Sequence, residues 1–380
     1  MDVLERLGRP AAVTALDGED AVYVVGGAVR DVLLGRQPHE LDFVVEGDAV
    51  AVARRAAERL GGSVTVHDRF GTATVTAPET VFDLAGARRE RYERPGALPD
   101  VELGAPLADD LARRDFTVNA IALHLADGEL MSYPGAREDL EAGRLRVLHD
   151  GSFRDDPTRL LRLARYVARL GFEAEARTDE LAGAAVAGGA VDTVTGSRLG
   201  AELRLLLREP QPEALLALER HGLGRALLGP GFHVDPEIVR RAMALTPPDG
   251  RADLAALATT GLDSGRLDDL AFPAHERDTV AAPIPDPRDR MSDAELWRAL
   301  RGARPESVAV AGARGADEAA RRWLADVRHR RLAITGHDLV AAGLEGPAVG
   351  AGLVAATEAM LEGRATTRED QLAAALPPSI

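Results

Sequence analysis

The chain has 380 residues, a length that predicts two to four domains rather than one small core. It contains no cysteine, which excludes disulfides and thiolate metal sites, and its formal net charge of −15 argues against generic nucleic-acid binding. Since it has no apolar run of about 18 residues and no signal-peptide pattern at its start, we expect a cytoplasmic protein without a membrane partner.

The first predicted elements are a short strand, a glycine turn and a helix. Tyr23-Val24-Val25 is β-branched and aromatic, which is typical of a buried strand. Gly26-Gly27 then allows backbone amides to approach an anion without a Cβ in the way. A helix is predicted over 28–35, and the amides at its start favour phosphate.

Two acidic residues accompany the next predicted strand, 41–45. Glu40 and Asp42 are two positions apart, so their carboxylates point to the same face. This arrangement suits Mg²⁺-dependent phosphoryl or nucleotidyl transfer. Each motif alone occurs often by chance, but their order favours this chemistry.

The remaining elements complete an α/β head and then a long helical part. Segment 88–112 is charged and proline-containing, so we predict a long loop that ends in a short helix. Segment 271–292 contains four prolines and is predicted to be a linker. Further strands are predicted at 63–67, 72–76, 80–84 and 117–124, and helices at 48–60, 157–170, 178–187, 196–208, 211–220, 235–244, 251–259, 293–301, 315–327, 336–342, 347–362 and 367–375.

Several segments resemble the class II tRNA nucleotidyltransferase/poly(A) polymerase family, which includes the CCA-adding enzymes. The strong similarity begins with Gly26 to Asp31 and the acid pair, and it keeps the family's order over about residues 20–175. The other segments are 69–75, 82–85, 92–99, 113–120, 153–159 and 169–172, with weaker similarity at 334–339 and 346–350.

The resemblance implies a specific architecture and activity. It implies an α+β head with a polymerase-β-like nucleotidyltransferase fold (1–137), followed by an all-α neck with nucleobase recognition (138–208), body (209–270) and tRNA-binding tail (271–380). The enzyme would extend a tRNA 3′ end from CTP and ATP without a template. Glu40 and Asp42 would be the catalytic carboxylates and would hold two Mg²⁺ ions. Rival hypotheses are a CC-only or A-only adding enzyme, a poly(A) polymerase, and a non-catalytic tRNA-binding relative; no protein partner is expected.

Asp156 and Arg159 are the candidates for base selection. They are three residues apart at a helix start, so they share a face. Cytosine and adenine both present an amino donor beside a ring-nitrogen acceptor, whereas uracil and guanine present the opposite order. An aspartate acceptor beside an arginine donor therefore selects C and A. The alternative is that the aspartates only cap the helix before Pro157; we expect Asp155 to cap it and Asp156 to read the base.

The resemblance also implies further nucleotide contacts. Arg30 would help the glycine turn to hold the triphosphate, with a structural pairing to Asp31 as an alternative of equal weight. Asp83 is either a third carboxylate or, as we favour, an acid that caps a turn. Asn119 is the only asparagine in the chain and would bond the ribose. The predicted nucleotide contacts are Gly26, Gly27, Arg30, Arg113, Arg114, Asp115, Asn119, Asp156, Arg159, Arg162 and Arg165.

Two residues depart from the family pattern, and a cluster of basic residues lies late in the chain. The first acid of the family is usually aspartate, but Glu40 keeps the charge, and related nucleotidyltransferases use Glu-x-Asp. Nothing explains Ser132, where the family usually has aspartate. A late basic cluster is predicted with equal weight to contact the tRNA backbone or to form a solvated helix face. It consists of Arg321, Arg322, Arg328, Arg330 and Arg331.

Overall fold

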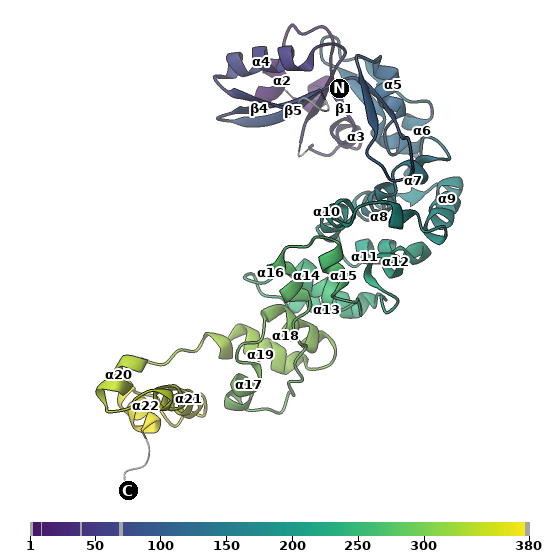
Figure 1. The fold of residues 1–380 in the computed structure, drawn as a ribbon. Coiled ribbons are helices and arrows are strands. Elements are labelled where there is room, and N and C mark those ends of the chain that lie inside the picture. Colours follow the sequence, from purple (N-terminus) through teal and green to yellow (C-terminus); the bar gives the residue numbers. More distant parts are fainter. Residues whose placement is uncertain (1–2, 9, 39, 68–70, 377–380) are drawn as a thin grey trace. The chain divides into compact units, whose positions relative to one another are not determined.

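The computed structural model describes residues 3–8, 10–38, 40–67 and 71–376 (Figure 1). The chain divides into two compact units, Met1–Leu206 and Leu207–Ile380. The predicted neck ends within two residues of this division. The predicted limits near 137 and 270 lie inside the units and stay predictions. Residues 69 and 70 of the family resemblance fall outside the described residues.

The first unit contains a mixed sheet, as the sequence predicts. Its strand order is β3-β4-β5-β2-β1-β8-β9, in which β2 pairs with β5 in parallel and the other neighbours are antiparallel. Strand β2, which follows the glycine turn and its helix in the chain, therefore lies in the middle of the sheet. The strands are β1 Val22–Val25, β2 Asp42–Val45, β3 Ser63–His67, β4 Thr72–Ala77, β5 Thr80–Gly86, β8 Ile121–His124 and β9 Leu130–Ser132.

Helix α4 (Ala49–Leu60) covers one face of β3, β4 and β5 (Figure 1). It begins after Asp48, whose carboxylate accepts the N–H of Ala51, and it ends at Gly61 in the left-handed conformation. Buried Val75 and Leu84 belong to that face, because strand residues alternate sides. Asp83 therefore lies on the opposite face of the sheet. Helix α2 (Ala11–Ala15) contacts α4, α3 (Gly27–Leu33) contacts β1 and β8, and α1 (Val3–Leu7) contacts α3.

Two predictions about the head are wrong in detail. The strand predicted at 117–124 is shorter, because Thr117–Asn119 forms a 3₁₀ turn that carries Asn119 away from the sheet ladder. The loop predicted at 88–112 contains a hairpin of β6 (Arg88–Arg91) and β7 (Asp100–Leu103) before α5 (Leu107–Ala112).

The helices after the head belong to the same compact unit up to residue 206. Helix α8 (Thr158–Leu170) buries Leu160, Leu161 and Leu163 and leaves several arginines on another face. The periodic apolar residues of the sequence thus predict this helix correctly. The other elements are α6 Ala136–Glu141, β10 Arg144–Leu145, α7 Ser152–Asp155, β11 Glu173–Ala174, α9 Ala176–Ala187, η3 Ala190–Thr193 and α10 Gly196–Leu207.

The second unit is helical, as predicted. Helix α16 (Ala274–Val280) lies within the predicted linker, and α18 (Pro305–Ala313) has no counterpart among the predicted helices. Among the described residues, no helix is long and apolar enough to cross a membrane. The remaining elements are α11 Glu213–Glu219, η4 Arg220–Gly222, α12 Leu223–Leu228, α13 Pro236–Leu245, α14 Ala252–Ala258, α15 Arg266–Asp269, α17 Asp293–Leu300, α19 Asp317–Ala325, η5 Val327–His329, α20 Gly336–Ala341, α21 Pro347–Leu361 and α22 Arg368–Ala375.

Candidate active site

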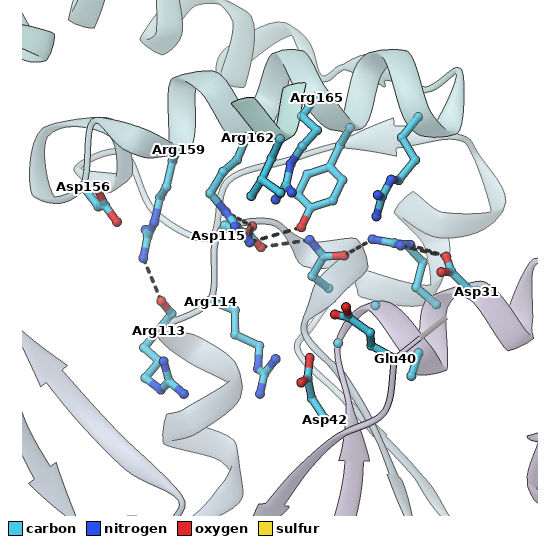
Figure 2. A pocket seen from close by; sticks show the side chains of 18 of the residues that line it. Asp31, Glu40, Asp42, Arg113, Arg114, Asp115, Asp156, Arg159, Arg162 and Arg165 are labelled. Atoms are coloured by element: carbon cyan, nitrogen blue, oxygen red, sulfur yellow. Dashed lines mark hydrogen bonds and ion pairs between the residues drawn. The ribbon is translucent and has the colours of Figure 1, made fainter. Parts of the chain in front are cut away.

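A cavity of about 670 Å³ lies within the first unit and brings the predicted site residues together (Figure 2). It is bordered by the glycine turn, the start of β2, the segment after α5 and one face of α8. The arginines of α8 follow one another along this cavity. The predicted residues that line it are Gly26, Gly27, Arg30, Glu40, Asp42, Arg113, Arg114, Asp115, Asn119, Asp156, Arg159, Arg162 and Arg165.

The glycine turn stands against Arg114. The N–H of Gly26 donates to the Ile121 carbonyl at 3.0 Å, and Gly26 has φ +67°, which favours glycine. A Cβ at this position would lie 2.9 Å from Nη1 of Arg114. Arg114 donates from Nη2 to Asp110, while its buried Nε has no hydrogen-bond partner among the described residues. The turn therefore lies directly against an incompletely bonded guanidinium in the wall of the cavity.

Glu40 and Asp42 both line the cavity, and their carboxylates point into it (Figure 2). Partial burial in the cavity raises the pKa of Asp42, Arg114 opposes this shift, and the charges of Glu40 and Asp83 add to it. A cation between the two carboxylates would relieve this repulsion. No group of three or more acid or histidine side chains close enough to hold a metal lies within the described residues. Two carboxylates nevertheless fit Mg²⁺, which takes few protein ligands and completes its shell with phosphates and water.

Asp83 does not cap a turn, contrary to our expectation. It lies within β5 as the register partner of Asp42, and its carboxylate accepts the Thr74 hydroxyl at 2.6 Å. Neighbouring strands place these two acids side by side on the face of the sheet opposite α4. Asp83 is nevertheless not among the residues that line the cavity.

Asp156 and Arg159 lie at one end of the row of arginines (Figure 2). Oδ1 of Asp156 accepts the N–H and hydroxyl of Thr158 and Nη2 of Arg198. Arg159 donates to the Ser152 hydroxyl at 2.6 Å and to the Arg113 carbonyl at 2.8 Å. The expected division of roles is therefore wrong in one respect: Asp156 itself receives the N–H at the helix start, whereas Asp155 ends α7.

Arg113 is held by acids on two elements. Its Nε and Nη2 donate to Asp110 and its Nη1 donates to Glu90 of β6, at 2.7–2.9 Å. Burial raises the pKa of Asp110, but Arg113 and Arg114 outweigh it and hold the pKa below its usual value. Glu90 also accepts the hydroxyl of Tyr92, and burial together with the Glu90 charge raises the pKa of Tyr92 to about 12. Arg113 thus links the hairpin to α5.

A buried network connects the head to α8. Asn119 accepts Nη1 of Arg30 at 2.7 Å and donates to Asp115 at 3.0 Å, so its amide is engaged on both sides. Asp115 also accepts two donors of Arg162, at 2.6 and 2.8 Å. Burial alone would raise the pKa of Asp115, but Arg162 and Asn119 lower it to about 2. Arg30 additionally pairs with Asp31 at 2.7 Å, the alternative that the sequence left open.

Sequence reasoning missed several residues of this site. Glu202 of α10 pairs with Arg162 at 3.2 Å and with Arg165 at 3.5 Å, and Arg198 of the same helix holds Asp156. Their spacing of four residues on one helix face is the only signal that the sequence offered. Tyr166 lines the cavity between the arginines of α8.

The late basic cluster is largely neutralised within the second unit. Arg321 pairs with Asp317 at 2.7 Å and Arg328 with Asp249 at 2.6 Å. Arg322 pairs with Asp293, and Arg330 pairs with Asp293 and Asp326. Arg331 donates to the carbonyls of residues 328 and 330. This pairing is what the solvated-face alternative predicts, and contact with tRNA stays a prediction.

Comparisons with known proteins agree with this architecture. Residues 22–146 match the family described as the Poly A polymerase head domain. The chain is 46% identical over 209 residues to an A-adding tRNA nucleotidyltransferase of Geobacter sulfurreducens, covering 54% of this chain and 24% of that protein. A CC-adding tRNA nucleotidyltransferase of Deinococcus radiodurans is 37% identical over 338 residues, covering 87% of this chain and 82% of that protein.

A solved structure extends the similarity to the whole chain. A CCA-adding enzyme in its apo form II superposes with a TM-score of 0.82 at 28% identity, covering 98% of both chains. The chain spans only about a quarter to a half of the first curated relatives that it matches. The Deinococcus enzyme, however, is matched in sequence over 82% of its length, and the match covers 87% of this chain. The chain therefore belongs to the class II tRNA nucleotidyltransferase/poly(A) polymerase family.

Proposed function

We propose that this protein is a template-independent nucleotidyltransferase that adds C and A nucleotides to the 3′ end of tRNA. One observation carries the proposal: a single cavity holds the same-face acids Glu40 and Asp42, the Gly26-Gly27 turn and the Asp156–Arg159 pair. A metal-binding edge, a phosphate-binding turn and a base-reading pair are the three parts that such a transfer needs.

In the proposed reaction, the 3′-hydroxyl oxygen of tRNA forms a bond to the α-phosphorus of the nucleoside triphosphate. The bond from that phosphorus to the oxygen bridging the β-phosphate breaks, pyrophosphate leaves, and the hydroxyl proton passes to solvent. Glu40 and Asp42 would hold two Mg²⁺ ions. When bound, these ions supply charge neutralisation at the attacking and departing oxygens.

The protein's own cations serve the phosphates. Nη1 of Arg114 lies against the glycine turn, and Arg114 lines the cavity, so we assign it to the triphosphate. Arg165 also lines the cavity and has only one ion-pair contact among the described residues, at 3.5 Å from Glu202, so it is assigned likewise. Three other arginines donate most of their hydrogen bonds to neighbouring carboxylates: Arg30 to Asp31, Arg113 to Asp110 and Arg162 to Asp115. We propose that these three arginines fix the shape of the cavity.

The base is read at the other end of the cavity. All three donors to Asp156 use Oδ1, so Oδ2 is its open acceptor within the described part of the chain. The guanidinium of Arg159 lies beside Asp156 and is fixed by hydrogen bonds from Nη1 and Nη2. Its Nε donates no hydrogen bond within the described part of the chain. An acceptor next to a donor matches the amino group and ring nitrogen of cytosine and adenine and meets the wrong groups on uracil and guanine.

The relatives leave the added sequence open, since they include A-adding, CC-adding and CCA-adding enzymes. We favour complete CCA addition, with CC-only addition, A-only addition and polyadenylation as alternatives within the class. A non-catalytic tRNA-binding protein is the alternative of another class.

An incorporation assay separates these alternatives. Purified protein, Mg²⁺ and labelled CTP or ATP are incubated with tRNAs that end before, within and after the terminal triplet, and the products are sequenced. CCA addition predicts C on the first two ends, A only after two C, and no extension of the complete end. Incorporation of ATP alone or unlimited A tails would change the assignment within the class, and tRNA binding without incorporation would refute the catalytic proposal.

A further inference from the structure

Tyr166 occupies the centre of the arginine row and has no role in the reaction described above. Its side chain is buried on α8, with only 7% of the residue exposed. The guanidinium carbons of Arg30, Arg162 and Arg165 lie 5.4, 5.6 and 5.2 Å from the centre of its ring. The Tyr166 hydroxyl also accepts Nη2 of Arg162 at 3.1 Å. One aromatic side chain therefore touches three cations.

The carboxylates nearby do not hold these cations equally. Arg30 has Asp31, and Arg162 has Asp115 and Glu202. Arg165 shares Glu202 at 3.5 Å, without a hydrogen bond to the Oε2 atom that it approaches, and its own Nε is unbonded among the described groups. Of these three arginines, Arg165 depends least on ion pairs and lies closest to the Tyr166 ring.

The Tyr166 ring can attract the guanidinium groups without neutralising their charge, which the carboxylates cannot do. Three guanidinium groups in one cavity repel each other, and the negative face of an aromatic ring attracts a cation at such distances. Unlike a further acid, a ring does not cancel the positive charge that an anionic ligand needs. The hydroxyl adds an acceptor that fixes Arg162 relative to the ring.

We infer that Tyr166 is a positioning residue that holds Arg165 and its neighbours in place for the triphosphate. This inference rests on the proposed function. It predicts an effect on the affinity for the phosphates and none on the choice of base, because Asp156 and Arg159 lie at the other end of the row (Figure 2). The ordinary alternative is packing alone, since Tyr166 makes an edge contact with Phe116 at 5.8 Å.

The test replaces Tyr166 by phenylalanine and then by difluoro- and pentafluorophenylalanine, which weaken the face of the ring while nearly preserving its size. Tripolyphosphate, which has neither base nor sugar, is titrated into each full-length variant by calorimetry with EDTA present, and CMP is titrated in parallel. The same replacements at Tyr133 are the matched control. Tyr133 is half-buried, does not line the cavity, and donates its hydroxyl to the Leu148 carbonyl.

The expected result is a stepwise rise in the tripolyphosphate dissociation constant, about five- to tenfold from phenylalanine to pentafluorophenylalanine. CMP affinity and the Tyr133 series should stay within about twofold, as expected for sites that do not use the ring. A flat tripolyphosphate series, an equal loss of CMP affinity, or no tripolyphosphate binding by the wild type would overturn the inference. Because binding is read without catalysis, failure of nucleotide incorporation would refute the proposed function separately.

Discussion

At the scale of single residues, the proposed catalytic residue Asp42 lies among like charges that repel its carboxylate. It lies beside Asp83 in register and near Glu40, and partial burial and these like charges raise its pKa. Replacing Asp42 by asparagine should therefore lower nucleotide incorporation by at least about a hundredfold, the scale of losing a charged group at a reacting centre. The melting temperature should stay unchanged or rise, because repulsion is removed.

Asp48→Asn is the matched control for this prediction. Asp48 lies six residues later, outside the cavity, and caps α4, a role that asparagine fills equally well. Both activity and melting temperature should be unaffected in that variant. Full activity of Asp42→Asn would contradict the assignment of the catalytic carboxylates.

Asp115 gives a prediction about pH. Its pKa is about 2 in the folded protein, where Arg162 and Asn119 outweigh its burial, against about 3.9 in an unfolded chain. The ionised carboxylate therefore stabilises the fold above about pH 4, and this contribution is lost as the pH falls towards 2. The difference in unfolding free energy between wild type and Asp115→Asn should shrink by about 2 kcal/mol between about pH 5 and pH 2.

Urea unfolding at a series of pH values measures this difference. Between about pH 7 and pH 5 it should be constant, which serves as an internal control because the carboxylate stays ionised in both states. A difference that is independent of pH down to the lowest value would show that Asp115 is not held as its ion pairs imply.

At the scale of elements, the hairpin of β6 and β7 depends on one close approach. Gly96 in its turn has φ +69°, and its N–H lies 3.3 Å from the carbonyls of Arg154 and Asp155. A Cβ there would overlap the Thr193 hydroxyl and lie 2.6 Å from the Thr193 carbonyl oxygen. The turn therefore rests directly on α7 and η3.

Gly96→Ala should consequently cost more than backbone strain alone. Gly104 is the control, since it has φ +78° but no atom within 4 Å of an added Cβ. Gly104→Ala should lower the unfolding free energy by about 1 kcal/mol, and Gly96→Ala by roughly 2–4 kcal/mol, because overlap adds to strain. Hydrogen exchange of residues 92–99 should accelerate only in Gly96→Ala, and equal effects of the two variants would refute the docked turn.

The same hairpin shows where the sequence was insufficient. Its first strand, Arg-Arg-Glu-Arg, has no apolar residue, and its second, Asp-Val-Glu-Leu, alternates over only four residues. The two strands are joined partly by ion pairs such as Arg89–Glu102. By contrast, β1 and α8 carry clear apolar patterns and were predicted to within one residue. Helix α18 is buried around its whole circumference, so it has no amphipathic period from which a helix could be recognised.

The sequence predicted which residues gather around one cavity, but it did not predict their hydrogen-bond and ion-pair partners. The glycine turn, the acids and the arginines all line one cavity. Long-range contacts, such as that of Arg162 with Glu202, decide which arginines keep donors for a ligand. No local sequence pattern reveals such contacts. The same limit applies to Asp156, whose Oδ1 is occupied by Arg198, 42 positions away.

At the scale of the whole molecule, the cavity belongs to the first unit alone. All of its lining residues lie between Gly26 and Leu205. A fragment that ends after residue 210 should therefore bind CTP with a dissociation constant within about threefold of the full chain, as expected for a site with independent contacts. Its affinity for tRNA should fall by more than about tenfold, since the proposed tail contacts are lost.

Calorimetry with CTP and filter binding with tRNA measure both quantities on the same preparation. The full chain is the control, and a circular dichroism melt establishes that the fragment is folded. Unchanged affinity for tRNA in the folded fragment would contradict the assignment of tRNA binding to the second unit.

The central claim is that this cavity both transfers the nucleotide and reads its base. The most direct test compares wild type with Arg159→Ala for Mg²⁺-dependent incorporation of CTP and UTP into a tRNA that lacks its 3′ triplet. Wild type should prefer CTP by at least about a hundredfold in kcat/KM, and the variant by less than about tenfold while still incorporating CTP, because a mispaired buried donor or acceptor costs about 1–3 kcal/mol. Undiminished preference for CTP in Arg159→Ala would contradict the account.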